Sequence, residues 1–394
     1  MSIKPYFILS GGYDTKNVGD YAMLDFLQKK FAQDDHDIKL LVRHEQNHLK
    51  DYYGITELIK NYEYNNKKES EGRFFRGFNN GENENHLIDL KEKLENSQGL
   101  IIGGGRLLID HTMDVMRGPL PYFATLVTLC KFLRVPVYIY AMTIVPCKTD
   151  EGNKLLRYII DNCERVSVRD EGSVKLLRSV GCINNEIDII PDPAFGLQWK
   201  MKLLQSNTKL KAGLTVRAID ETWGGISSDN YIKKMTNIIK LFQDNNIEVI
   251  GIPHQYYGID DKKCDDRTIL NEISKFINFK VIEDEILDLR EYQKIYESLD
   301  ILVGIRRHSF IYAAISGVPV LPFSENPNAS RACNDIGIED KDILGLSENY
   351  DNHKYKLEKF LSTLQDRQTI QNKKVEYQKD KLKYAYDKFF KLDE

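Results

Sequence analysis

The chain has 394 residues, more than a single hydrophobic core usually supports, so its length predicts two domains. Hydrophobic residues make up 42% and charged residues 29%, a balance that is typical of globular proteins and excludes a disordered chain. The formal net charge of −4, from 55 basic and 59 acidic residues, provides no basic excess and argues against nucleic acid as a partner.

The cysteines and the hydrophobic segments limit which metal sites, disulfides and cellular locations are expected. The six cysteines are scattered, with neither a CxxC spacing nor histidines at the distances typical of zinc sites. This pattern argues against a disulfide framework and a metal site, and we expect no cofactor. The N-terminal apolar run is too short for a signal peptide, and no segment approaches the ~20 apolar residues that span a bilayer. We therefore expect a cytoplasmic protein, working in solution or at the inner face of the membrane.

Apolar runs of strand length alternate with segments of helical period, which is the pattern of a parallel sheet with crossover helices. In the first half this pattern predicts strands at Tyr6–Ser10, Leu100–Gly103, Val135–Tyr140, Arg165–Val168 and Ile187–Ile190. It predicts helices at Tyr21–Gln33, Tyr122–Phe132, Lys154–Cys163 and Asp170–Val180. The segment at about 61–85 is rich in Asn, Glu and Gly and has no hydrophobic period, which predicts a loop insertion.

The same alternation starts again after the polar run 198–209. It predicts strands at Ala212–Val216, Glu248–Ile252, Ile301–Val303 and Pro319–Pro322. The predicted helices are Asp229–Asn245, Asp266–Phe276, Asp288–Ser298, Phe310–Ser316, Lys354–Leu364 and Arg367–Phe389. The chain is therefore predicted to be an α/β protein with an N-terminal Rossmann-like domain (1–197), a C-terminal Rossmann-like domain (210–345) and C-terminal helices (350–394).

A first glycine-rich motif, SGGYDTKNVGDYAML, lies between a predicted strand and a predicted helix at 10–24. A sharp turn that points backbone N–H groups outward at a helix N-terminus suits a phosphate or a carboxylate. The spacing matches neither the dinucleotide-binding nor the P-loop pattern. Asn17 and Asp20 are candidate binding residues here. The structural alternative is a tight turn in which Asp20 caps the helix.

A second motif, LIIGGGRLLID, ends the strand Leu100–Gly103. The glycines Gly103, Gly104 and Gly105 allow a ligand or another backbone to come close. Ligands of parallel sheets bind beyond the carboxyl ends of the strands, where these glycines fall. Asp110 follows them and is a candidate base for a sugar hydroxyl, with a helix cap or a structural hydrogen bond as the equally supported alternative.

A third motif, LVGIRRHSFIYAAISGVPVLPF, places Arg306, Arg307 and His308 between an apolar strand and an apolar helix. Arginine binds carboxylate or phosphate with two parallel hydrogen bonds, and histidine exchanges protons near neutral pH. This position favours a functional site over an exposed charged turn or a core histidine. Arg217 at the end of the strand GLTVR and His254 after the next strand are weaker candidates, since ordinary loop chemistry explains both.

Taken in order, these segments resemble the polysaccharide pyruvyl transferase family. The resemblance rests on GGY…NVGDYAML, IIGGGRLLID, VSVRDEGSVKLLRSVG, PDPAF and GIRRH…GVPVLPF, which together extend from about Ser10 to Gly337. It implies a fold like that of GT-B glycosyltransferases, with two Rossmann-like domains and the active site in the cleft between them. It also implies transfer of pyruvate from phosphoenolpyruvate onto two hydroxyls of one sugar, with formation of a cyclic ketal and release of phosphate.

The resemblance assigns roles residue by residue. Arg306 and His308 match the family's Arg-x-His donor motif, and Arg217 matches a donor-contacting arginine at a strand end. Asp110 matches the acid after the glycine triplet, near the acceptor. We accordingly expect Gly103, Gly104, Gly105 and Arg307 on the donor side, with Asn17, Asp20 and His254 in acceptor-binding or loop positions. The acceptor is a nucleotide sugar, a lipid-linked oligosaccharide or a glycan, and the sequence leaves all three open.

The sequence departs from the family pattern in two places. Asn328 stands where many members have a lysine, and Arg307 occupies a position that is usually apolar. One rival hypothesis is a glycosyltransferase with a nucleotide-sugar donor, in which Glu325 or Glu283 holds the ribose. The other is a family member without catalysis. The Lys-rich C-terminal helices also allow peripheral contact with anionic lipid, for which solvated helix faces are the simpler alternative.

Overall fold

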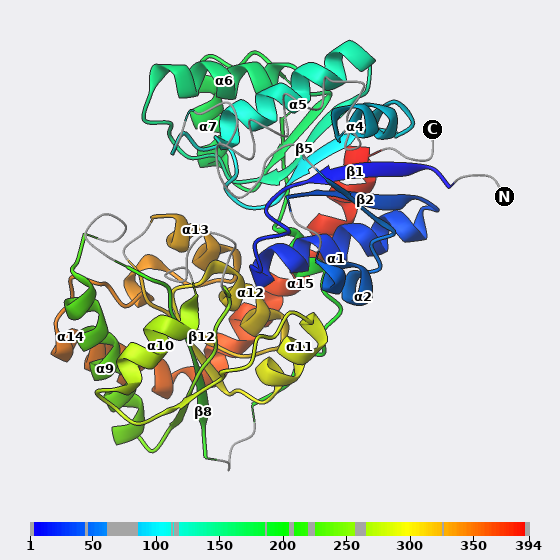
Figure 1. Cartoon of the computed structure of the whole chain (residues 1–394). Coiled ribbons are helices and arrows are strands. Elements are labelled where there is room, and N and C mark those ends of the chain that lie inside the picture. Colours follow the sequence, from blue (N-terminus) through cyan, green and yellow to red (C-terminus); the bar gives the residue numbers. More distant parts are fainter. Residues whose placement is uncertain are drawn as a thin grey trace. The chain divides into compact units, whose positions relative to one another are not determined.

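The computed structural model describes residues 4–43, 46–60, 86–111, 113, 118–185, 187–204, 209–219, 225–256, 265–324 and 327–390. The chain forms two compact units (Figure 1). Unit 1 comprises Met1–Asp14, Met23–Pro193 and Lys381–Glu394, and unit 2 comprises Thr15–Ala22 and Ala194–Asp380. The predicted insertion at about 61–85 lies outside the described residues.

Unit 1 contains a seven-stranded parallel sheet in the order β3-β2-β1-β4-β5-β6-β7. Its strands are β1 (Tyr6–Ser10), β2 (Asp37–Val42), β3 (Glu57–Lys60), β4 (Leu100–Gly103), β5 (Val137–Met142), β6 (Arg165–Val168) and β7 (Ile187–Ile189). The sheet order reverses between β1 and β4, so the carboxyl ends of these two strands form the position where parallel α/β sheets usually bind ligands.

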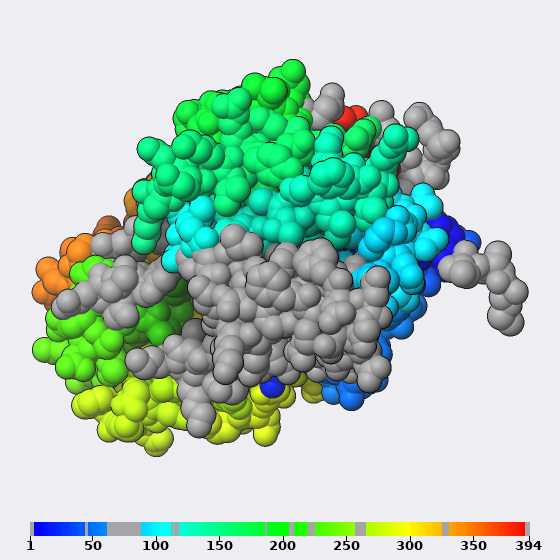
Figure 2. Space-filling view, turned by 45° about the horizontal axis from the view of Figure 1, so that its top comes forward, coloured from blue at the N-terminus to red at the C-terminus, as the bar shows by residue number. Residues whose placement is uncertain are grey.

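Helices cover both faces of this sheet. They are α1 (Val18–Gln33), α2 (Asn47–Tyr53), α4 (His86–Glu95), α5 (Pro119–Leu133), α6 (Asp150–Asp161) and α7 (Glu171–Ser179). Alternate residues of β1 face opposite sides, since Tyr6 and Ile8 join the core under α4 to α7 whereas Phe7 stacks on Phe31 of α1. The residues of α5, α6 and α7 form a continuous face of unit 1, coloured teal to green in Figure 2.

Unit 2 contains a five-stranded parallel sheet in the order β10-β9-β8-β11-β12. Its strands are β8 (Lys211–Thr215), β9 (Glu248–Gly251), β10 (Lys280–Val281), β11 (Ile301–Gly304) and β12 (Val320–Pro322). Its helices are α9 (Ser228–Asp244), α10 (Asp266–Ser274), α11 (Leu289–Glu297), α12 (Arg307–Ile315), α13 (Pro327–Asp335), α14 (Tyr350–Ser362) and the part of α15 (Leu364–Phe390) up to Asp380. The order reverses between β8 and β11, so both units have the Rossmann-like arrangement that the sequence predicts.

Several predicted elements match closely, and the differences have local causes. β1, β4 and β6 have the predicted bounds, whereas β2, β3, α2 and α4 were not predicted. α1 begins at Val18 rather than Tyr21, because the side chain of Asn17 accepts a hydrogen bond from the backbone N–H of Gly19 at 3.0 Å. The alternative role of Asp20 as the helix cap is therefore wrong, since Asp20 lies inside the first turn.

The division into units differs from the predicted domains 1–197, 210–345 and 350–394 at both ends of the chain. Thr15–Ala22 groups with unit 2, and Lys381–Glu394 groups with unit 1. The reason at the C-terminus is aromatic packing. Tyr386 and Phe390, at the end of α15, stack on Phe31 with ring centroids 5.8 and 4.9 Å apart.

Two further expectations concern membranes and metals. None of the helices within the described ranges is long and apolar enough to cross a bilayer. The same residues contain no group of three or more His, Cys, Asp or Glu side chains placed to hold a metal ion. Four of the five described cysteines are buried, and Cys264 lies outside the described residues.

Candidate functional site

The loop from β11 to α12 brings the third motif to the position where the sheet order of unit 2 reverses. Gly304 ends β11, and a methyl group there would overlap the hydroxyl of Thr215 on β8, so only glycine allows this strand pairing. Arg306 is the N-cap of α12, and Arg307 and His308 form its first turn. α12 therefore begins three residues earlier than the predicted Phe310, which places both charged residues at a helix N-terminus, where anions are favoured.

Arg306 is held by a buried carboxylate that sequence reasoning missed. Its Nε donates to the carbonyl of Val216 and to Oδ2 of Asp266, at 3.1 Å in each case, and its Nη2 donates to Oδ1 of Asp266. Asp266 is 1% exposed and also accepts the backbone N–H groups of His254 at 2.9 Å and Gln255 at 3.0 Å. Burial raises the pKa of Asp266, and the charge of Arg306 and these hydrogen bonds oppose the rise.

His308 lies against the first turn of α1. A methyl group on Gly19 would overlap the imidazole of His308, so the absence of a side chain at Gly19 makes room for this ring. His308 is half-buried, and its charge contributes to the electrostatic environment of His254. His308 is half-buried at a helix N-terminus and close in sequence to an anchored arginine. This is a position from which a histidine can donate a proton to a bound anion.

The first turn of α1 is attached to unit 2 through backbone hydrogen bonds. Val18 donates its N–H to the carbonyl of His254 at 3.0 Å and accepts the hydroxyl of Tyr312 at 2.6 Å. Asn17 pairs with Gln255 in an isolated antiparallel bridge. Asn17 and Asp20, which the sequence places in acceptor-binding or loop positions of the N-terminal domain, therefore belong to the compact unit that contains Arg306 and His308.

His254 is a core residue of unit 2 and not an exposed contact. It is 2% exposed, its Nε2 shares a hydrogen bond with the hydroxyl of Tyr296 at 2.7 Å, and its ring packs on Tyr292 and Tyr312. Burial lowers its pKa well below the ordinary value, and the nearby charges of Arg306 and His308 lower it further. These contacts favour a structural role for His254, and its acceptor-binding or loop position stays a prediction.

The two remaining arginines flank the same loop. Arg217 lies two residues beyond β8 and directly follows Val216, the residue whose carbonyl binds Arg306. Arg307 lies on α12, with its Nη2 3.6 Å from a carboxylate oxygen of Asp335 on α13. The structure thus gathers Asn17, Arg217, Arg306, Arg307 and His308 in unit 2, around the reversal between β8 and β11.

The glycine triplet of unit 1 has structural contacts. A Cβ on Gly104 would meet the Cε of Met23 at 2.7 Å and the hydroxyl of Tyr13 at 3.2 Å, and Gly104 has a φ of +85°. A Cβ on Gly103 would meet the same hydroxyl at 3.2 Å, and a Cβ on Gly11 would meet the carbonyl oxygen of Gly103 at 2.5 Å. Gly105 also has a positive φ, of 71°. Side chains and backbone of the protein itself fill the space at Gly103 and Gly104.

Asp110 connects two loops of unit 1. Its Oδ2 accepts the backbone N–H groups of Lys148 and Thr149 at 2.6 and 2.8 Å and the hydroxyl of Thr149 at 3.0 Å. Thr149 is in turn the N-cap of α6. Burial raises the pKa of Asp110, but these hydrogen bonds outweigh it and hold the pKa below the ordinary value. These contacts favour the structural alternative.

Other segments that carry the family resemblance are also structural. Arg169 and Asp192 form a buried ion pair of 2.7 Å that joins the ends of β6 and β7, and Arg169 also contacts the sulfur of Met23. Asp170 caps α7 by accepting the N–H of Ser173 at 2.7 Å. The VRDEGS and PDPAF segments therefore stabilise the carboxyl edge of the sheet in unit 1.

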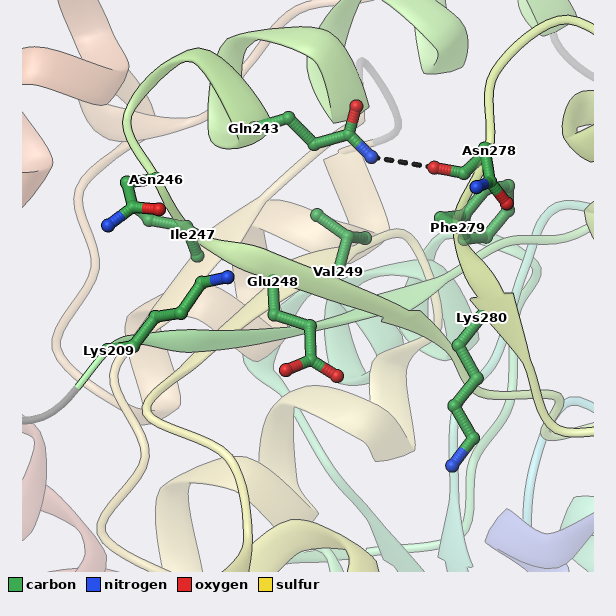
Figure 3. A pocket seen from close by; sticks show the side chains of 9 residues that line it. All are labelled: Lys209, Gln243, Asn246, Ile247, Glu248, Val249, Asn278, Phe279 and Lys280. Atoms are coloured by element: carbon green, nitrogen blue, oxygen red, sulfur yellow. Dashed lines mark hydrogen bonds between the residues drawn. The ribbon is translucent and has the colours of Figure 1, made fainter.

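Two cavities lie elsewhere. The first, of about 470 Å³, is at the amino ends of β8 to β10, opposite the edge that carries the charged loop (Figure 3). Its polar lining includes Lys209, Glu248 and Lys280, and Gln243 donates across it to the carbonyl of Asn278 at 2.7 Å. The second, of about 730 Å³, is an apolar groove between α5 and α6 that includes the exposed ring of Phe132. Neither contains the predicted site residues.

Solved structures with this fold extend over almost the whole chain. A UDP-GlcNAc 2-epimerase from Neisseria meningitidis bound to UDP-GlcNAc is 11% identical, with a TM-score of 0.59 over 98% of this chain and 99% of that one. The Anabaena protein Alr3699/HepE in complex with UDP-glucose is 10% identical, with a TM-score of 0.59 over 97% and 99%. MnaA of S. aureus, solved with UDP, has 10% identity and a TM-score of 0.59 over 99% and 98%.

The fold and the charged loop define a class first. Two Rossmann-like units with parallel sheets, similar in fold to these solved structures, make the chain a GT-B-like protein, as predicted. The family follows from the sequence match, because the profile of the polysaccharide pyruvyl transferases covers residues 17–327, about four-fifths of the chain. The chain belongs to the polysaccharide pyruvyl transferase family and is a transferase, which confirms the predicted resemblance and the predicted enzyme class.

Proposed function

We propose that the protein transfers the pyruvyl group of phosphoenolpyruvate onto two hydroxyls of one sugar during polysaccharide synthesis. The reaction forms a cyclic ketal and releases phosphate. The observation that supports this proposal is the arrangement of the loop after β11. Arg306 is anchored there by Asp266, and His308, in the first turn of α12, lies against Gly19 of α1. Phosphoenolpyruvate carries a carboxylate and a phosphate, which need several cationic groups in one place.

The proposed donor site uses the gathered arginines and the helix N-terminus. Arg306 binds one anionic group of the donor, and Arg217 and Arg307 bind the other, with the partial positive charge of the α12 N-terminus beside them. These cations also stabilise the negative charge on the departing phosphate. Gly103, Gly104 and Gly105, which the sequence places on the donor side, do not enter this proposal, because internal contacts explain Gly103 and Gly104.

The proposed chemistry has two additions. His308 protonates the methylene carbon of the donor while a sugar hydroxyl forms a bond to the neighbouring carbon and loses its proton to a base. The C–O bond to phosphate then breaks and phosphate departs, and a second hydroxyl of the same sugar attacks that carbon and gives its proton to the departing phosphate. The family resemblance proposes Asp110 as the base. Its hydrogen bonds to Lys148 and Thr149 and its lowered pKa weaken that proposal.

A nucleotide-linked sugar is the acceptor class that we propose first. Its support is the likeness to structures solved with UDP-GlcNAc, UDP-glucose and UDP. The same likeness supports the second candidate function, a glycosyltransferase that uses a nucleotide-sugar donor. Of the acids proposed for holding a ribose in that case, Glu325 lies outside the described residues. Glu283 is exposed beyond β10 and accepts a hydrogen bond from Asn271 at 3.2 Å.

We further propose that the reaction takes place in the cytoplasm. Contact with the inner face of the membrane stays a prediction, and the support for this contact is α15, where lysines flank the exposed side chains of Tyr377 and Tyr384. Flotation with vesicles that contain anionic lipid tests the contact. Salt-sensitive binding is expected, and its absence in low salt would contradict the prediction.

The experiment that tests the proposed function is binding of phosphoenolpyruvate, measured by calorimetry in the presence and absence of a sugar-nucleotide panel. The wild type is expected to bind saturably, and Arg306→Ala is expected to lose binding. Arg290→Ala is the matched control, because the side chain of Arg290 is 72% exposed and its guanidinium pairs with Asp288 outside the loop. Stabilisation by a nucleotide sugar without any response to phosphoenolpyruvate would instead favour the glycosyltransferase.

A further inference from the structure

Asp266 is the first residue of α10, and its carboxylate is fully enclosed by described groups. Oδ2 accepts two backbone N–H groups from the loop after β9, those of His254 and Gln255, and both oxygens accept from Arg306. A buried carboxylate is tolerated only when its oxygens are hydrogen-bonded and its charge is paired. Asp266 therefore links three segments, namely the loop after β9, the N-terminus of α10 and the loop after β11.

The pairing uses one particular edge of the guanidinium. Nε and Nη2 of Arg306 face Asp266, and Nε also donates to the carbonyl of Val216. Within the part of the chain that the structure describes, Nη1 has no hydrogen-bond partner. A guanidinium has a side edge formed by Nε with one Nη and an end edge formed by both Nη atoms, and each edge matches the two oxygens of a carboxylate. In Arg306 the side edge is occupied, and the end edge remains for a ligand.

We propose that Asp266 is a positioning residue that fixes the side edge of Arg306 and so presents the end edge to a carboxylate or phosphate of the donor. This inference rests on the proposed function, because the donor is the ligand that the end edge binds. It adds a residue from outside the three predicted motifs. Asp266 also holds the loop after β9, because it accepts the backbone N–H groups of His254 and Gln255.

An asparagine at this position separates positioning from folding. In Asp266→Asn the amide oxygen still accepts the N–H groups of His254 and Gln255 and that of Nε of Arg306, while the amide NH₂, in place of Oδ1, faces the Nη2–H of Arg306. Two donors then oppose each other, and the guanidinium loses its orientation. Asp265→Asn is the matched control one residue away. Asp265 caps α10 and pairs with Arg267, with Oδ2 2.6 Å from Nη2, and no hydrogen bond or ion pair of Asp265 with Arg306 occurs among the described residues.

The test measures phosphoenolpyruvate binding and the ligand-free melting temperature of both variants. We expect Asp266→Asn to weaken binding at least tenfold, with a matching rise in KM, and Asp265→Asn to keep binding within about twofold of the wild type. In Arg306→Ala the further change Asp266→Asn is expected to have no added effect on binding, because positioning acts only through Arg306. Wild-type affinity in folded Asp266→Asn, or an additive loss in the double variant, would overturn the inference.

Two further measurements test the inference if Asp266→Asn does not fold or if the wild type does not bind phosphoenolpyruvate. Arg306→Lys retains an ion pair with Asp266 but has no end edge, so it is expected to fold and to lose binding at least tenfold even if Asp266→Asn does not fold. If wild-type protein does not bind phosphoenolpyruvate, the proposed function fails by itself. The positioning is then read from the Nε–H resonance of Arg306 in ¹⁵N-labelled protein, which should shift in Asp266→Asn and stay in place in Asp265→Asn. An unchanged resonance in Asp266→Asn contradicts the inference.

Discussion

The two units place glycines and charged residues at equivalent points of their sheets and use them differently. In unit 1, the carboxyl ends of β1 and β4 carry Gly103 and Gly104, against which Tyr13 and Met23 pack. In unit 2, the carboxyl ends of β8 and β11 carry Arg217 and Arg306, the latter fixed by buried Asp266. The same position in the same strand order is filled by hydrophobic contact in one unit and by organised charge in the other.

This difference teaches that a glycine-rich strand end is an opening that the rest of the fold fills in different ways. The side chains that occupy it in unit 1 are Tyr13, from the turn between β1 and α1, and Met23, from α1 itself. In unit 2, Gly304 admits the hydroxyl of Thr215 instead, and the charged residues follow on α12. We therefore expect substitutions at the end of β4 to change stability and substitutions at the start of α12 to change turnover.

The largest expected effect is on His308. His308→Gln should lower turnover by about 10²- to 10⁴-fold, because glutamine fills the space beside Gly19 but cannot transfer a proton. Phosphoenolpyruvate affinity and melting temperature should remain near wild type. Steady-state kinetics with calorimetry measures both, and His36→Gln in unit 1 is the control. A near-normal turnover in His308→Gln would remove the contrast between the units.

Gly104→Ala tests the unit 1 side of the comparison. A methyl group at Gly104 meets Met23 at 2.7 Å in a backbone with φ of +85°, so we expect a loss of about 2–4 kcal/mol in the free energy of unfolding. Gly225→Ala is the control for the backbone cost alone, because it has φ of +66° and open space around it. Denaturant unfolding gives the difference. Equal losses in both variants would show that the packing against Met23 contributes nothing.

The pH dependence of stability tests the buried histidine of unit 2. Its folded-state pKa is lowered, so below the unfolded value of about 6.5 the unfolded chain takes up a proton that folded His254 does not. Stability should therefore fall as pH drops from 7 to 5, by up to about 2 kcal/mol for this group. Denaturation midpoints should change less with pH in His254→Gln. Burial also lowers the pKa of His353, so that variant keeps part of the slope.

The smallest expected effect is on Asp110. Asp110→Asn keeps one oxygen to accept the N–H groups of Lys148 and Thr149, so we expect a loss of about 1 kcal/mol in stability and a turnover within tenfold of wild type. Thermal unfolding and steady-state kinetics separate the two roles. If turnover instead falls a hundredfold at unchanged stability, the carboxylate acts as the base, and unit 1 also contributes chemistry.

Local patterns were sufficient to predict much of the fold. Tyr6–Ser10, Leu100–Gly103 and Arg165–Val168 form strands with the predicted bounds, because short strand-like runs are visible in the local sequence alone. β2 and β3 were missed, and β3, with four residues, directly precedes the segment at 61–85, which has no hydrophobic period. The start of α1 was missed because Asn17, not Asp20, provides the cap.

Periodicity and motif order are local or linear properties of the chain, and they were sufficient to predict the two Rossmann-like halves, the family and the charged loop at Arg306 and His308. The tertiary structure was needed to show which candidates belong together. It assigned Asn17 to unit 2, buried His254 among tyrosines and introduced Asp266 as the partner of Arg306. Hydrogen bonds between segments far apart in the chain produce no regular spacing in the sequence. The burial of a side chain and the identity of its partner are therefore known only from the folded structure.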